Sequence, residues 1–124
     1  SFSKTSSGGR PLILTGVTAP LYLEVSGALS TYDDTNNVNS GVTVSANVPF
    51  AGISCWSGST LKVAARGGSI VTGSFDGSMG SGAAPVLSSS AWGYRFNGII
   101  SKLNIGTTMA TDAQITSYLK GTLV

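Results

Sequence analysis

The sequence contains no histidine and a single cysteine, Cys55. Without histidine, neither a Ser-His nor a Cys-His pair can form, which excludes hydrolases that activate a serine or cysteine nucleophile with histidine. A lone cysteine excludes a disulfide within the chain, and we expect Cys55 to act as a small buried apolar residue. Zinc and other transition metals, which favour clusters of histidine and cysteine, are almost excluded as well.

Charge is also scarce, with seven lysines and arginines, five acids and a net charge of +2 in 124 residues. The cations are scattered, whereas a nucleic-acid backbone needs them clustered. No apolar run approaches the roughly 20 residues that span a membrane. We therefore expect no nucleic-acid partner and no membrane insertion. Serine, threonine, glycine and asparagine supply the polarity instead, which is typical of β-rich proteins displayed outside the cell.

The few acids argue against catalysis. Glycosidases on jelly-roll folds need two carboxylates about 5–10 Å apart around the scissile bond. Here Glu24 is a lone strand acid, and Asp112 is better explained as a helix-capping residue. We therefore expect that the protein is not an enzyme.

Short apolar segments separated by turn residues run along the chain, as expected for about seven to nine strands with turns every 8–12 residues. Pro20 and Pro49 are expected to end strands. Residues 1–9 are predicted to be a flexible N-terminal arm or linker, and residues 30–41 and 73–85 to be loops. The strands are predicted at residues 10–18, 21–25, 42–48, 52–57, 60–66, 69–72, 86–87, 91–92 and 96–105.

One helix is predicted near the C-terminus, over residues 112–120. Thr111 and Gln114 have the spacing of a reciprocal capping box, and Gly121 can end the helix. Ile115 and Leu119 share one face. Because two turns are not stable alone, this helix must lie on a sheet. The sequence thus predicts an all-β protein: residues 10–124 form a single antiparallel β-sandwich of jelly-roll type with one short C-terminal helix.

Three stretches in the second half carry a resemblance to a known family. They are LKVAARGGSIV (61–71), FNGIISKLNI (96–105) and TDAQITSYLKG (111–121). In this order they resemble the C-terminal half of concanavalin A-like, laminin-G-like lectin domains, especially those of bacteriophage tail and other virion proteins. The resemblance covers about half of the chain, residues 61–121. It implies a concanavalin A-like sandwich, closed by the helix, that binds sugar.

Sugar sites combine an aromatic face with amide and carboxylate groups that bind hydroxyls. The same aromatic residues could instead cover one edge of the sandwich or form an oligomer interface. The candidate ligand-binding residues are Trp92, Tyr94, Arg95, Asn97 and Tyr32.

The loop at residues 33–39 is rich in oxygen ligands, which calcium prefers. Its candidate calcium ligands are Asp33, Asp34, Asn36 and Asn37. The spacing is not that of an EF-hand, and the alternative is a plain turn, in which aspartate and asparagine are common. No other cofactor is expected.

The leading expectation for function is a non-enzymatic virion component, such as a phage tail-fibre, capsid or decoration protein, at the virion surface and thus extracellular. Its lectin-like domain would attach to a host-surface glycan or help to assemble the particle. Its partners would be other virion subunits or itself as a homo-oligomer, most simply a trimer. The alternatives are a secreted or cell-surface bacterial carbohydrate-binding module and a glycoside hydrolase of jelly-roll fold.

Overall fold

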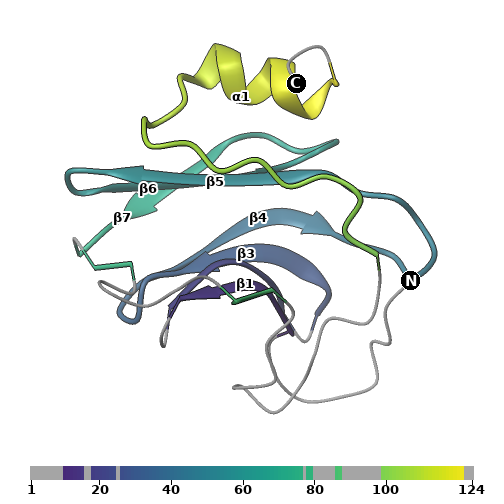
Figure 1. Ribbon diagram of the computed structural model, residues 1–124, viewed down its shortest axis with the longest axis horizontal. Coiled ribbons are helices and arrows are strands. Elements are labelled where there is room, and N and C mark those ends of the chain that lie inside the picture. The colour runs from purple at the N-terminus through teal and green to yellow at the C-terminus, as the bar shows by residue number, and fades with distance from the viewer. Residues whose placement is uncertain are drawn as a thin grey trace.

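A computed structural model describes residues 10–15, 18–24, 26–76, 78–79, 86–87 and 99–121. These residues form eight strands and one helix (Figure 1). The elements are β1 (Arg10–Thr15), β2 (Thr18–Leu23), β3 (Ala28–Tyr32), β4 (Asn37–Thr43), β5 (Gly52–Ser57), β6 (Thr60–Ala65), β7 (Val71–Ser74), β8 (Val86–Leu87) and α1 (Asp112–Leu119). The predicted arm at residues 1–9 and the predicted strand at 91–92 lie outside the described residues.

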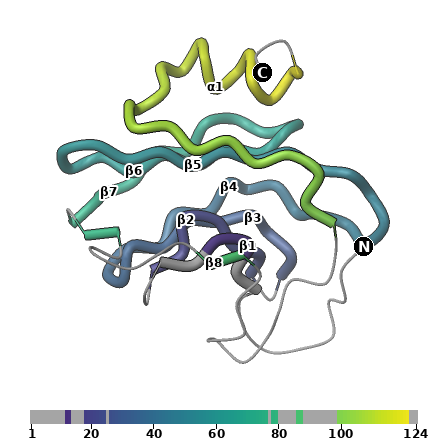
Figure 2. Tube along the Cα trace, viewed as in Figure 1, coloured from purple at the N-terminus to yellow at the C-terminus, as the bar shows by residue number. Residues whose placement is uncertain are grey.

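The strands form two antiparallel sheets, one with the order β4-β3-β2-β1-β8 and one with the order β5-β6-β7. The sheets stack face to face, and α1 lies on the far side of the three-stranded sheet, so that the molecule has three layers (Figures 1 and 2). The prediction of an all-β antiparallel sandwich with one short C-terminal helix is confirmed.

Strand β6 supplies the centre of the structure because it is covered on both faces. Leu61, Val63 and Ala65 alternate along it and are buried against the five-stranded sheet, as the sequence predicts. Opposite them lie Leu23 and Leu29, which have no exposed surface. Burying a leucine side chain contributes about 1.5–3 kcal/mol to folding, so this layer is the main source of stability.

A second apolar layer lies between the three-stranded sheet and α1. Ala64, on the other face of β6, packs with Ile115 and Leu119 of the helix, and Ile53 and Cys55 of β5 complete this contact. The helix is thus held by the two residues that the sequence places on its apolar face. Cys55 is only partly buried there.

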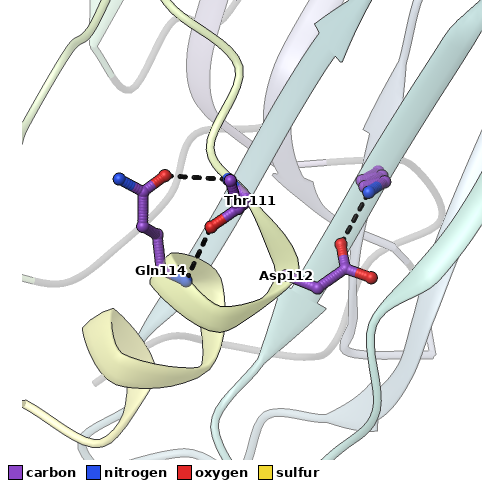
Figure 3. A network of polar contacts seen from close by, with 4 residues as sticks. Thr111, Asp112 and Gln114 are labelled. Atoms are coloured by element: carbon purple, nitrogen blue, oxygen red, sulfur yellow. Dashed lines mark hydrogen bonds and ion pairs between the residues drawn. The ribbon is translucent and has the colours of Figure 1, made fainter.

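The helix begins as predicted. Thr111 Oγ1 accepts a hydrogen bond from the Gln114 backbone N–H at 3.2 Å, and Gln114 Oε1 accepts one from the Thr111 N–H at 2.9 Å (Figure 3). Asp112 accepts a hydrogen bond from Lys62 Nζ at 2.6 Å, in an ion pair whose aspartate side is largely exposed. Such pairs add little to stability. At the other end Gly121 adopts the expected left-handed conformation, with φ of 80°. At eight residues, α1 is too short to cross a membrane, and the described residues contain no other helix.

The predicted loop at residues 30–41 is wrong, because most of it belongs to a hairpin. Strands β3 and β4 pair in antiparallel register, with Thr31 opposite Val38 and Tyr32 opposite Asn37. Of the polar residues that suggested a loop, Ser30, Asn37 and Asn39 occupy strand positions on the outer face, whereas Thr31 and Ser40 are buried on the side of Val38. Only residues 33–36 form the turn, where Asp34 takes a positive φ of 79°.

Two neighbouring predictions are wrong as well. The strand expected at 42–48 is not formed, because β4 already ends at Thr43. Val44 is still buried, but Val48 is exposed. Pro20 does not end a strand but lies inside β2, at a register irregularity between Ala19 and Tyr22. A proline is tolerated there because the interrupted ladder needs no N–H donor at that position.

The strand predicted at residues 96–105 is not formed over its described part, residues 99–105. This segment leads towards α1 (Figure 2). Ile99, Leu103 and Ile105 are 88%, 41% and 72% exposed, and only Ile100 packs against the main core. The alternating apolar residues that suggested a strand therefore lie mostly on the surface.

A candidate binding face on the five-stranded sheet

The outer face of the five-stranded sheet gathers polar and aromatic side chains in register. Tyr22 of β2 lies opposite Ser30 of β3, which lies opposite Asn39 of β4, and Tyr32 lies opposite Asn37. Residues at paired positions point to the same face of a sheet. We define the Glu24 cluster as Tyr22, Glu24, Ser30, Tyr32, Asn37 and Asn39.

Hydrogen bonds fix the centre of this cluster. Glu24 Oε1 accepts from Ser30 Oγ at 2.7 Å and from Asn37 Nδ2 at 3.1 Å. Its second oxygen, Oε2, accepts a long bond of 3.4 Å from Ser26 Oγ, and Asn39 is a further side-chain hydrogen-bond partner of the carboxylate. Tyr22 donates its hydroxyl hydrogen to Asn37 Oδ1 at 2.8 Å. These bonds hold the carboxylate in one orientation.

The surroundings keep Glu24 ionised and Tyr22 neutral. Burial opposes the charge of Glu24, but hydrogen bonds from Ser30, Asn37, Asn39 and Ser26 outweigh it and hold the pKa of Glu24 below its usual value. Burial, together with the charge of Glu24, raises the pKa of Tyr22 to about 12. Near neutral pH the cluster therefore presents one negative charge, and Tyr22 remains a hydrogen-bond donor.

Access to the cluster is uneven. Tyr22 and Ser30 are buried, while Glu24, Tyr32 and Asn39 are half-buried and Asn37 is exposed. The side chains that a ligand can reach are thus one carboxylate, two amides and one aromatic ring. This set can bind hydroxyl groups and can contact an apolar ring face.

The loop predicted to bind calcium is organised around a buried carboxylate. Asp33 Oδ1 accepts from the backbone N–H groups of Thr35, at 3.0 Å, and of Asn36. Its Oδ2 accepts from Asn36 Nδ2 at 3.0 Å and from the Asp76 N–H at 3.1 Å. Burial opposes the charge, but these donors outweigh it and hold the pKa of Asp33 below its usual value. Four N–H groups directed at one carboxylate fill the positions that a cation would use.

Of the other predicted calcium ligands, Asn36 contacts Asp33, but through its N–H donors rather than its oxygen. Asp34 is exposed, and Asn37 turns to the sheet face, where it contacts Tyr22 and Glu24. Within the described residues, no group of three acidic, histidine or cysteine side chains is placed to hold a metal ion. The plain turn, which was the alternative interpretation of this loop, accounts for its contacts.

Of the predicted ligand-binding residues, four lie outside the described residues: Trp92, Tyr94, Arg95 and Asn97. Tyr32 belongs to the Glu24 cluster, where it packs beside Ala19 and Tyr22. Its hydroxyl donates to the Asp34 carbonyl at 2.9 Å.

Sequence reasoning missed Tyr22, Glu24 and Asn39 as candidate ligand-binding residues. A signal for two of them was present, because Tyr22 and Glu24 alternate with Leu21 and Leu23 along one strand and so share its polar face. Asn39 had no comparable signal, since the segment that contains it was expected to be a loop.

Comparison with known family models, with curated proteins and with solved structures finds no significant match for this chain. The class that the structure defines is an all-β sandwich with a covering helix.

Proposed function

We propose that the chain is a non-enzymatic, lectin-like domain displayed at the virion surface, which binds a host-surface glycan through the Glu24 cluster. The observation that carries this proposal is the fixed carboxylate on the outer sheet face, flanked by two amides and Tyr32. Sugar hydroxyls are donors and acceptors at once, so they suit a surface of mixed carboxylate and amide groups. The placement on a virion rests on the resemblance of residues 61–121 to phage lectin domains.

The contacts of Glu24 favour binding over hydrolysis. A general acid in a glycosidase needs a raised pKa and a second carboxylate across the bond. The pKa of Glu24 is lowered, and its hydrogen bonds come from hydroxyl and amide groups. Glu24 is thus suited to accept hydrogen bonds from a ligand and poorly suited to protonate one.

We also propose that the domain works as a homo-oligomer, a trimer in the simplest case, among other virion subunits. Three exposed apolar side chains on one segment, Ile99, Leu103 and Ile105, support this. Light scattering of the purified chain measures the mass directly. A monomer would overturn this part of the proposal and favour the secreted or cell-surface carbohydrate-binding module.

A glycan array followed by titration calorimetry tests the binding proposal, with and without calcium. Glu24→Gln should weaken binding of the best glycan by at least about tenfold, because a hydrogen bond to a charged group contributes about 1.5–3 kcal/mol. Asp112→Asn makes the same chemical change on α1 and should leave binding unchanged. The proposal fails if no glycan binds, or if Glu24→Gln binds as tightly as the wild type.

A further inference from the structure

A groove that shares no residue with the Glu24 cluster lies where the turn after β6 meets the end of α1. Its volume is about 510 Å³, within the range of roughly 300–1,000 Å³ that is usual for small-molecule sites. We call it the Arg66 groove; its lining includes Ala65, Arg66, Ile70, Thr116, Leu119 and Lys120.

The groove combines an apolar floor with positive charge. Its apolar part is supplied by Ile70, which is half-buried, and by the edge of Leu119, whereas the side chain of Ala65 packs into the core between the two sheets. The charged residues in its lining are Arg66 and Lys120, and the lining contains no acid. In a chain with only seven lysines and arginines, two at one groove create a local preference for an anion.

Arg66 is positioned by the helix. Its Nε donates to the Leu119 carbonyl at 2.6 Å, one of the carbonyls that the end of a helix leaves without an intrahelical partner. This bond fixes the guanidinium plane but uses only one of its five N–H groups. Within the described part of the chain, neither Nη group has a hydrogen-bond partner, so both can face a ligand.

We propose that the Arg66 groove binds a small organic anion that joins a carboxylate to an apolar ring. The two Nη groups of Arg66 bind the carboxylate side by side, in the geometry that suits the guanidinium fork. Lys120 adds its charge at the rim, and Ile70 and Leu119 contact the ring. This binding does not depend on the Glu24 cluster.

The test is a titration of the ¹⁵N-labelled chain, followed by NMR, with 1-naphthoate and with the neutral 1-naphthalenemethanol as probes. Naphthoate should shift the backbone amides of Gly67, Gly68 and Thr116 and leave those of the Glu24 cluster in place. The neutral probe should bind at least about fivefold more weakly, because it lacks the charge that the two cations attract. Equal affinities for the two probes, or shifts centred on another surface, would overturn the proposal.

Charge-removing variants inside and outside the groove show whether naphthoate binds at the groove or responds to the net charge of the chain. Lys120→Gln removes a charge at an exposed position, and we expect it to weaken naphthoate binding about threefold, as is typical of a partly screened charge. Arg66→Gln should weaken it about tenfold or more. Lys102→Gln, at an exposed position outside the groove lining, is the matched control and should have no effect.

Arg66→Gln also removes the hydrogen bond to the Leu119 carbonyl and could therefore unfold the chain. In that case the naphthoate affinity of Lys120→Gln tests whether the anion binds at this groove. Equal naphthoate affinities for Lys120→Gln and Lys102→Gln would overturn the role of Lys120. Naphthoate binding by Glu24→Gln at wild-type affinity is expected even if the glycan proposal fails, so the two proposals are tested separately.

Discussion

Replacing Asp33 with alanine tests whether a buried carboxylate holds the turn between β3 and β4 without a metal ion. The side chain has no exposed surface and accepts four hydrogen bonds from N–H groups. Each bond to a charged acceptor contributes about 1.5–3 kcal/mol when it is shielded from water. Two of the donors, on Thr35 and Asp76, belong to exposed residues, so water can replace part of what is lost.

We therefore expect Asp33→Ala to lower the free energy of unfolding by about 3 kcal/mol, well below the sum of four shielded bonds. For a domain of this size that corresponds to a fall in Tm of roughly 10 °C. Asp33→Asn keeps the size but puts an amide NH₂ where an acceptor is needed, and should cost about 2 kcal/mol. The control is Asp34→Asn, which is exposed at a positive φ that asparagine tolerates and should change stability by less than about 0.5 kcal/mol.

The assay is denaturant unfolding in buffer that contains a chelator, repeated with added calcium. The reasoning is refuted if Asp33→Ala unfolds at the wild-type midpoint. It is also refuted if calcium stabilises the wild type by several degrees and this gain disappears in Asp33→Ala, since the carboxylate would then be a calcium ligand.

The dependence on pH gives a second check. Because the pKa of Asp33 is lower in the folded chain than in the unfolded one, its contribution is fully present above the unfolded pKa of about 3.9. This contribution is lost as the pH falls through the lower, folded value. Below about pH 4 the Tm of the wild type should therefore fall more steeply than that of Asp33→Asn. Parallel curves would contradict the lowered pKa.

The remaining predictions concern stability and are measured by urea unfolding. Thr31→Val should stabilise the chain by about 1 kcal/mol, because the buried Thr31 hydroxyl has no hydrogen-bond partner among the described residues; a loss would mean that the hydroxyl is bonded. Ile105→Ala should cost less than about 0.5 kcal/mol and Ile115→Ala about 2–5 kcal/mol, since these side chains are 72% and 1% exposed; the reverse order would contradict the structure. Thr111→Ala should cost about 1 kcal/mol through loss of the cap on α1, and an unchanged midpoint would show that the cap adds nothing.

The parts of the fold that were predictable have local signals that agree with their surroundings. The helix has its own cap, its own apolar face and its own terminating glycine, so its limits follow from nearby residues. Strand β6 alternates between Leu61 and Val63 on one side and Lys62 and Ala64 on the other. One face of β6 packs against the five-stranded sheet and the other against α1, and the alternation predicts a strand whichever layer covers each face.

The hairpin of β3 and β4 was not predictable by the same means. Ser30, Asn37 and Asn39 have poor strand propensity, and they are tolerated because they face outward, where Glu24 supplies their hydrogen bonds. That partnership joins residues up to 15 positions apart and cannot be inferred from composition. The missed hairpin and the missed candidate binding face thus have one cause.

At residues 99–105 the error is the opposite one: a strand was predicted but is not formed. The composition of this segment is typical of a strand, but none of the strands that the structure describes pairs with it. Isoleucine and leucine alternate with polar residues there, as in a half-buried strand. In the structure the segment is the path to α1, which must lie on the far face of the three-stranded sheet to cover Ala64 (Figure 1). Pattern alone cannot tell a strand from an extended connection when the pairing partner is set by the fold.

The three layers also determine where a polar binding surface can form. The three-stranded sheet is covered on one face by the five-stranded sheet and on the other by α1 (Figure 2), so β6 has little room for outward polar groups. On the outer face of the five-stranded sheet, β2, β3 and β4 can carry such groups without loss of core contacts, because Leu23 and Leu29 already fill their inner face. The Glu24 cluster lies on the sheet face that leaves these core contacts intact.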